Sequence, residues 1–239
     1  MRTPARANHE SPDTTQHVEQ KRGFMPTRIT LIRHGESVWN TNGRWQGQAV
    51  VALSEAGRHQ AVLLAEHLCP LAAEIAAITS SDALRARETA ALIASRLNKP
   101  LTLDARLREI DTGQWQGLTA EEVEAWDAER LAAVRADPYN VPRPDGESYN
   151  QVADRAIRAL QDLVDQYPDQ HVLAVTHGGT IRSILYRLGM AEKTPRFFGN
   201  TSLTSLLHGH TGSDGAAWTL DTCNVMEHLG SVRVGDPDS

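Results

Sequence analysis

Two histidines in the sequence follow short apolar segments, and a glycine follows each of them. The segment RITLIR (28–33) ends directly before His34, and the segment HVLAVT (171–176) ends directly before His177. A buried strand needs no imidazole at its end. An imidazole can, however, attack phosphorus as a neutral nucleophile and leave again, which divides one difficult displacement into two easier steps. We therefore treat both histidines as candidate catalytic residues for phosphoryl transfer.

Phosphoryl transfer also needs planar cations around the oxygens of the transferred group, and arginine suits this task better than lysine. Arg33 stands beside His34, and Arg85 follows a third apolar segment in the motif TSSDALRA. Arg87 competes for the same role. We choose Arg85 because it lies nearer to the end of that segment.

Two further features complete a phosphoryl-transfer site. A helix that begins after Gly178 and Gly179 offers an anion its backbone N–H groups and the positive end of its dipole. Glu109 lies in the motif LREID, at the end of a segment that we expect to be extended. A carboxylic acid at this place can protonate the leaving oxygen.

Each of these residues also has an ordinary structural explanation. His177 fits a hydrogen-bonded core histidine, and Arg85 fits the solvated face of a helix. Glu109 fits a surface ion pair with a neighbouring arginine, Arg106 or Arg108. The joint arrangement favours a functional site, because the ordinary explanations would require several coincidences in one chain.

Strand and helix signals alternate along the chain from residue 28. The segments 28–32, 75–79 and 171–176 predict strands, and the last is apolar at nearly every residue, which is typical of a central parallel strand buried on both faces. The alternation predicts an α/β fold, a three-layer sandwich with a mostly parallel central sheet and helices on both faces. Ligands bind such sheets at the carboxyl ends of the strands, so we expect the two histidines to meet at one edge.

Capping signals locate the helices between these strands. Ser54 is a plausible N-cap, and Thr119 and Ser148 each begin a capping box. The predicted helices span 54–69, 80–98, 119–134, 148–167 and 180–189. The segments 201–208 and 216–223 predict a hairpin near the C-terminus.

The composition describes an ordinary globular chain of 239 residues, long enough for one well-filled α/β domain. A net charge of −6 favours no nucleic-acid partner, although single arginines can still form a local positive pocket. Cys69 and Cys223 lie far apart with no C-x-x-C spacing, which argues against a disulfide framework or a thiolate zinc site and favours a reducing, cytoplasmic compartment. No segment has the length and apolarity of a membrane span or a signal peptide.

Both ends of the chain lack apolar periodicity. Residues 1–26 are polar and contain three prolines, so we expect a disordered leader. Met25 stands directly before the first predicted strand, and translation that starts at Met25 is a second possibility. Residues 226–239 are predicted to form a flexible tail.

Taken together, the motifs resemble those of the histidine phosphatase superfamily, also called phosphoglycerate-mutase-like, over about residues 28–223. The matching pieces, in chain order, are LIRHGESVWN, GRWQG followed by LSEAG, SSDALRARETA, LREIDTGQWQG, PDGES and VTHGGTIR. The resemblance implies one phosphoglycerate-mutase-like domain at 27–225, in which 119–147 is a helical insertion that forms a lid. It also implies a reaction without a metal or another cofactor.

The resemblance assigns roles to particular residues. His34 corresponds to the nucleophile that becomes phosphorylated, and Glu109 corresponds to the usual general acid. With the glycine at the start of the predicted helix included, the expected phosphate-binding residues are Arg33, Asn40, Arg85, His177 and Gly178.

Three functions remain open at this point. The first is a metal-independent phosphomonoesterase that acts on a small phosphorylated metabolite, the second is a mutase that returns the phosphoryl group to its substrate, and the third is a binding module without turnover. The module is disfavoured because no pocket residue is missing. Family mutases carry a longer insertion than the one helix and proline-rich loop at 118–147, which favours the hydrolase. A homodimer is also possible.

The substrate itself is not determined by the sequence. The chain departs from the family pattern at Val50 and Ala52, where the family commonly has Asp and Pro, and at Gln114 and Gln116 within a motif that commonly reads GEWEG. None of these four positions is expected to touch the phosphate pocket. In the lid, Trp126 and Tyr139 are candidates for substrate contact, and packing of the lid on the domain is an equal alternative.

Overall fold

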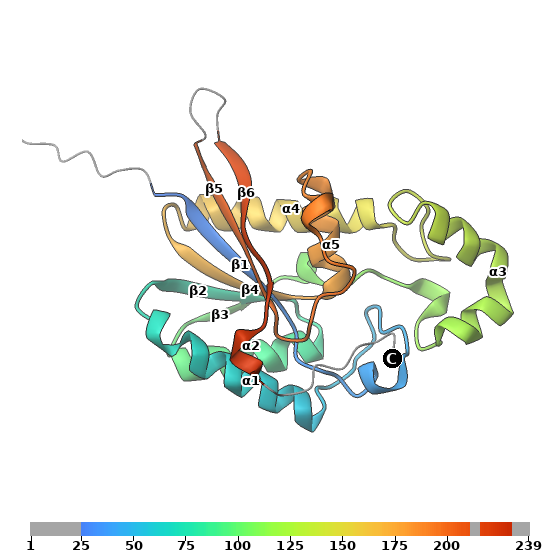
Figure 1. The fold of residues 1–239 in the computed structure, drawn as a ribbon, viewed down its shortest axis with the longest axis horizontal. Coiled ribbons are helices and arrows are strands. Elements are labelled where there is room, and N and C mark those ends of the chain that lie inside the picture. The colour runs from blue at the N-terminus through green and yellow to red at the C-terminus, as the bar shows by residue number, and fades with distance from the viewer. Residues whose placement is uncertain (1–24, 211–215, 231–239) are drawn as a thin grey trace, which may run out of the picture.

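A six-stranded sheet forms the centre of the computed structural model, which describes residues 25–210 and 216–230 (Figure 1). The strands are β1 (Thr27–Arg33), β2 (Ile75–Ser80), β3 (Leu101–Leu103), β4 (His171–Thr176), β5 (Leu203–His210) and β6 (Ala216–Val225). Their order across the sheet is β3-β2-β4-β1-β5-β6. The first four of these pair in parallel, and the predicted C-terminal hairpin, β5–β6, adds the antiparallel pairings. The mostly parallel sheet is confirmed.

Helices cover both faces of this sheet (Figure 1), which confirms the three-layer architecture. The helices are α1 (Glu55–Leu68), α2 (Leu84–Leu97), α3 (Ala120–Ala136), α4 (Tyr149–Gln166) and α5 (Gly178–Arg187). One apolar cluster joins α1 and α2 to the sheet, and a second joins α4 and α5 to its opposite face. No helix in the described ranges has the length and apolarity needed to cross a membrane.

The central position of β1 and β4 brings the two histidine motifs together. The strands are hydrogen-bonded neighbours, and Arg33 pairs in register with Thr176. The backbone N–H of His34 then donates to the carbonyl of Thr176 at 3.0 Å. Because parallel neighbours end at the same edge of a sheet, His34 and His177 emerge side by side, as the sequence predicted.

The segment 101–110 differs from the prediction of an extended chain. β3 ends at Leu103, and a 3-10 turn, Ala105–Leu107, follows it. Asp104 caps this turn by accepting a hydrogen bond from the N–H of Arg106, and Leu107 is buried in the cluster beneath α4. Glu109 therefore lies in a loop beyond the turn rather than at the end of a strand.

The helix α3 lies beyond the end of the sheet and is attached through a small apolar cluster of its own (Figure 1). Trp115 is fully buried in this cluster, and its indole N–H donates to Asp127 at 3.0 Å. Asp127 has non-helical backbone angles, which mark a kink within the helix. The capping boxes predicted at Thr119 and Ser148 are both present.

The expected flexible tail at 226–239 is wrong for its first five residues. Residues 227–229 form a 3-10 turn, and the side chain of Leu229 is only 3% exposed. His228 also forms a hydrogen bond with Thr201 at 3.0 Å. Apolar burial therefore holds this segment against the domain. Residues 231–239 and the predicted leader up to residue 24 lie outside the described residues.

A close approach between two backbones fixes the loop that carries His34. A Cβ atom added at Gly57, in the first turn of α1, would lie 1.9 Å from the carbonyl oxygen of Glu36. Ser54, the predicted N-cap of this helix, donates its hydroxyl to the Glu36 carboxylate at 2.6 Å. The loop after β1 and the start of α1 thus form one packed unit.

Gly57→Ala tests this close approach. In an unconstrained helix a Gly-to-Ala change stabilises by about 0.5–1 kcal/mol, whereas here the new methyl group must displace a backbone carbonyl. We expect the melting temperature to fall, and to fall further than in Gly43→Ala, because Gly43 has a positive φ of 60° but no atom within 4 Å of an added Cβ. A melting temperature for Gly57→Ala equal to that of the wild type would contradict the packing described.

Candidate active site

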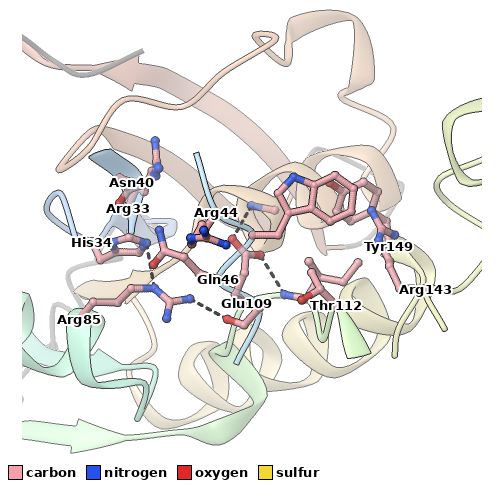
Figure 2. Close-up of a pocket in the computed structure, with 14 residues that line it drawn as sticks. Arg33, His34, Asn40, Arg44, Gln46, Arg85, Glu109, Thr112, Arg143 and Tyr149 are labelled. Carbon is pink, nitrogen blue, oxygen red and sulfur yellow. Dashed lines mark hydrogen bonds between the residues drawn. The ribbon is translucent and has the colours of Figure 1, made fainter. Parts of the chain in front are cut away.

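A pocket of about 360 Å³ opens at the carboxyl edge of the sheet (Figure 2). Its lining comes from the end of β1 and the loop after it, from α2 and from the loop after β3. The loop before α4 and the first residues of α4 and α5 complete it. The lining residues are Arg33, His34, Asn40, Arg44, Trp45, Gln46, Gly47, Arg85, Glu109, Ile110, Thr112, Arg143, Tyr149 and Gly179.

The imidazole of His34 is held in one tautomer. Its Nδ1 lies 2.6 Å from the carbonyl oxygen of Gly35, and because a carbonyl can only accept, Nδ1 must carry the proton. Nε2 is then unprotonated, and it accepts a hydrogen bond from Nε of Arg85 at 3.2 Å. The lone pair of Nε2 therefore points toward the guanidinium, where a phosphoryl group would lie.

Burial also keeps His34 neutral. The side chain is 3% exposed, and this desolvation lowers the pKa of His34 well below its usual value. The positive charges of Arg85 and Arg33 lower the pKa further. A neutral imidazole at neutral pH is the form that a nucleophile needs.

Arg85, rather than Arg87, belongs to the pocket. Arg85 is 1% exposed, and its two terminal nitrogens donate to the carbonyls of Gly47 and Ala49 at 2.8 and 3.2 Å. Burial lowers the pKa of Arg85 to about 10, so the group remains a cation at neutral pH. Arg87 is exposed on the outer side of α2.

Arg33 is fixed next to His34 by the loop before β5. Its Nη1 donates to the carbonyl of Phe198, and its guanidinium lies 4.7 Å from the centre of the Phe197 ring. Burial lowers the pKa of Arg33 to about 10, and the Glu109 carboxylate opposes this effect. Nε of Arg33 has no hydrogen-bond partner among the residues that the structure describes, so it is a free donor for an anion.

His177 packs behind His34, with 5.1 Å between the ring centres. Its Nε2 lies 2.9 Å from the hydroxyl of Ser81, which also accepts a hydrogen bond from the N–H of Ala83. The Ser81 hydroxyl can donate to Nε2 or accept from it, because its oxygen has two lone pairs. Within the described ranges Nδ1 has no partner, and burial lowers the pKa of His177 well below its usual value. The sequence analysis did not identify Ser81 as the residue that orients this ring.

Both carboxylate oxygens of Glu109 are held by backbone N–H groups. Oε1 accepts from Ile110 at 2.9 Å, and Oε2 accepts from Gly179, in the first turn of α5, at 3.1 Å. A Cβ atom at Gly179 would lie 2.4 Å from Oε1, so a side chain there would displace the carboxylate. The helix start thus positions the candidate acid.

The interpretation of Glu109 as a surface ion-pair partner is wrong. Arg106 pairs with Asp104 and Asp162, and Arg108 pairs with Asp82. Each of these arginines is therefore neutralised by aspartates outside the pocket.

The remaining predicted residues lie as follows. Asn40 lines the pocket. Its Oδ1 accepts two hydrogen bonds from Ser37, so its amide NH₂ group points away from Ser37. Gly178 does not line the pocket, and an added Cβ there would meet Arg33 at 3.6 Å. Its neighbour Gly179 is the glycine that faces the cavity. The departures from the family pattern at Val50, Ala52, Gln114 and Gln116 all lie outside the lining, as expected.

The side of the pocket toward the segment 119–147, which was expected to form a lid, contains residues that the sequence analysis missed. Trp126 is 56% exposed and does not line the pocket, and Tyr139 stacks on Tyr186 with 3.4 Å between ring centres. The residues that do reach the pocket from this side are Arg143 and Tyr149. Arg143 stands in a proline-rich loop without periodicity, so local sequence offers no sign that its side chain is buried.

No group of three or more His, Cys, Asp or Glu side chains in the described part of the chain is arranged to hold a metal ion. The candidate site consists instead of imidazoles, guanidiniums and one carboxylate, a donor set suited to an oxyanion.

Comparison with known proteins defines the class. The model of the histidine phosphatase superfamily (branch 1) matches residues 29–221, and the chain belongs to that superfamily. A metal-independent phosphoserine phosphatase of Arabidopsis thaliana is 35% identical over 208 residues, which cover 86% of this chain and 84% of that one. A glucosyl-3-phosphoglycerate phosphatase of Mycolicibacterium vanbaalenii is 37% identical over 220 residues, which cover 84% of this chain and 96% of that one.

A solved structure agrees with these relatives. The mycobacterial glucosyl-3-phosphoglycerate phosphatase complexed with VO₃ superimposes with a TM-score of 0.71 at 35% identity, covering 82% of this chain and 98% of that one. The protein is accordingly an enzyme of the phosphatase type within the superfamily.

The neutral state of His34 has a measurable consequence. We expect its ring not to titrate near pH 6.5 but well below, and Arg85→Gln to raise its pKa, because the Arg85 charge lowers it. Arg87→Gln is the matched control, and it should leave the titration unchanged because Arg87 is exposed. NMR titration of the labelled imidazole measures both effects, and a wild-type His34 that titrates near pH 6.5 would refute the description.

The same burial predicts how stability depends on pH. The pKa values of His34 and His177 are lowered in the folded state, so the unfolded chain binds more protons below about pH 6.5. The free energy of unfolding therefore has its full value above that pH, and it decreases as the pH falls toward the folded-state pKa values. Urea unfolding between pH 5 and 7.5 tests whether the free energy of unfolding decreases as the pH falls.

Proposed function

We propose that this protein hydrolyses a small phosphomonoester without a metal, through a phosphohistidine formed on Nε2 of His34. The observation that carries the proposal is the state of His34, which is neutral, has its proton on Nδ1 and lies 3.2 Å from the Arg85 guanidinium. The relatives named above are phosphatases of small phosphorylated metabolites, which supports the same class of reaction.

In the first step, the Nε2 lone pair attacks phosphorus and the bond from phosphorus to the ester oxygen breaks. Arg33 and Arg85 neutralise the charge on the non-bridging oxygens, and we assign Nδ1 of His177, which has no partner among the described residues, as a donor to one of them. The leaving oxygen takes a proton from Glu109 and departs as an alcohol. The Gly35 carbonyl stabilises the positive charge that develops on the His34 ring.

In the second step, a water molecule attacks the phosphorus of the phosphohistidine. Glu109, now a carboxylate, accepts a proton from this water, and the bond from phosphorus to Nε2 breaks. Inorganic phosphate leaves and His34 returns to its neutral tautomer. The carboxyl group thus serves as acid and then as base, without net change.

A mutase would pass the phosphoryl group to an alcohol of the substrate in place of water. The insertion whose length differs between mutases and phosphatases is short here, since residues 118–147 form only α3 and one loop. With 3-phosphoglycerate as substrate, we expect inorganic phosphate rather than 2-phosphoglycerate as the product. Isomer formation without phosphate release would favour the mutase.

Chemical trapping tests the intermediate. We expect rapid quenching of the enzyme with a ³²P-labelled phosphomonoester to leave a label that is lost in acid and kept in base, because phosphohistidine is acid-labile. His34→Ala should abolish both the label and turnover, whereas His59→Ala, at an exposed position of α1, should leave both intact. Full activity in His34→Ala would exclude the mechanism.

Leaving-group dependence tests the role of Glu109. A general acid matters most when the departing alkoxide is a poor leaving group, so Glu109→Gln should lower kcat/KM for an alkyl phosphate by roughly 10²-fold or more. The loss should be much smaller with p-nitrophenyl phosphate, whose leaving group needs no proton, because kcat/KM reports only the steps up to formation of the phosphoenzyme.

Glu147→Gln is the matched control for Glu109→Gln. Glu147 pairs with Arg155 at 2.8 Å and does not line the pocket, so any loss should be equal for the two substrates. Equal, large losses in Glu109→Gln would mean that Glu109 organises the pocket rather than donates the proton.

A further inference from the structure

Arg143 is a buried cation at the end of the pocket away from the nucleophile. Figure 2 shows His34 and Arg85 on one side of the cavity, Arg143 and Tyr149 on the other, and Glu109 between them. The side chain of Arg143 is 8% exposed and belongs to the pocket lining. The mechanism above uses the first end of the pocket and leaves Arg143 without a role.

Among the described residues no carboxylate forms an ion pair with Arg143, although the charges of Glu109 and Glu147 act on it from a greater distance. Its Nη1 donates two long hydrogen bonds of 3.4 Å, to the carbonyls of Pro138 and Glu147, and its guanidinium lies 4.5 Å from the centre of the Tyr149 ring. The nearby Glu147 carboxylate already pairs with Arg155.

Other arginines in the same region are neutralised. Arg44 lines the same pocket and pairs with Glu122 at 3.0 Å, and Arg155 pairs with Glu147 at 2.8 Å. A buried cation without an ion pair is costly, so the guanidinium of Arg143 indicates a place for an anion from outside the chain. Burial lowers the pKa of Arg143, but arginine remains charged at neutral pH.

We propose that Arg143 binds a second anionic group of the substrate, a carboxylate, while the phosphoryl group of the same molecule lies at His34. This inference rests on the proposed function. A single planar guanidinium offers two parallel donors that match a carboxylate. A second phosphoryl group would call for further cations, such as the pair formed by Arg33 and Arg85 at the opposite end.

The substrate class that follows is the phosphomonoester of a small hydroxy acid, with phosphoryl and carboxylate groups at opposite ends of a 360 Å³ pocket. The wall at Arg143 also borders a second groove. Trp45, Arg143 and Tyr149 line both cavities. The second groove has a volume of about 380 Å³ and extends toward Tyr139 and Arg182. A substituent on the hydroxy acid therefore has space beyond the carboxylate.

Two matched pairs of substrates test the proposal. Within each pair only the carboxylate changes: it becomes a CH₂OH group from 3-phosphoglycerate to glycerol 3-phosphate, and a hydrogen atom from O-phosphoserine to phosphoethanolamine. We expect the wild type to prefer the carboxylated member of at least one pair. In Arg143→Gln the ratio of kcat/KM values within that pair should fall about 10- to 100-fold, the range for a charge-assisted hydrogen bond.

Controls separate recognition from structure. Arg143→Lys keeps the charge but loses the planar fork, and we expect it to retain part of the preference. Arg187→Gln, at an exposed arginine of α5 that pairs with Asp154 at 2.6 Å, removes the same charge elsewhere and should leave the ratio unchanged. If Arg143→Gln lowers both members of a pair equally, Arg143 only supports the fold, and the proposal is wrong.

Two other outcomes would also overturn it. One is a wild type without preference in either pair. The other is a stronger, Arg143-dependent preference for 1,3-propanediol bisphosphate, which would assign the site to a second phosphoryl group. Failure of the proposed function is distinguishable from all of these, because it would abolish acid-labile labelling of His34 with every substrate.

Discussion

The active centre depends on keeping one imidazole neutral and oriented while cations surround it. The Gly35 carbonyl fixes the proton of His34 on Nδ1, and burial together with Arg33 and Arg85 disfavours a second proton. The same cations that suppress protonation of the ring are suited to bind the phosphoryl oxygens. One arrangement of arginines therefore both disfavours a proton on His34 and is suited to bind the substrate. This arrangement requires that the loop after β1 stays packed against the start of α1.

Backbone carbonyls have a large part in holding these cations. Arg85 donates to Gly47 and Ala49, and Arg33 donates to Phe198. A carbonyl orients a guanidinium without cancelling its charge, whereas a carboxylate partner would. The pocket can therefore carry more arginines than carboxylates within a chain whose net charge is −6, because fields are focused in clefts rather than averaged over the surface.

The segment 119–147 is attached to the rest of the domain through specific contacts. Trp115 follows closely after Glu109 in the chain and is bonded to the kink of α3 at Asp127. Glu147, just before α4, accepts the N–H of Asp111 and pairs with Arg155, whose guanidinium also donates to the carbonyl of Glu109. The loop that holds Glu109 and the segment that holds Arg143 are thus joined by shared hydrogen bonds, which fix the two side chains relative to each other.

The sequence alone determined the succession of strands and helices along the chain, the capping boxes and the two histidines at strand ends. Each of these depends on spacing within one segment. The parallel alternation was then enough to bring His34 and His177 to one edge. Only the tertiary structure decided the tautomer of His34, the burial of Arg85 but not Arg87, the loop position of Glu109 and the presence of Arg143 in the pocket. The tautomer of His34 is set by the carbonyl of the adjacent Gly35, in the conformation that the packed loop imposes. The other features depend on groups that lie tens of residues away in the chain, such as Gly47 for Arg85 and Gly179 for Glu109. Local periodicity carries no information on such partners, since they are created when the layers pack.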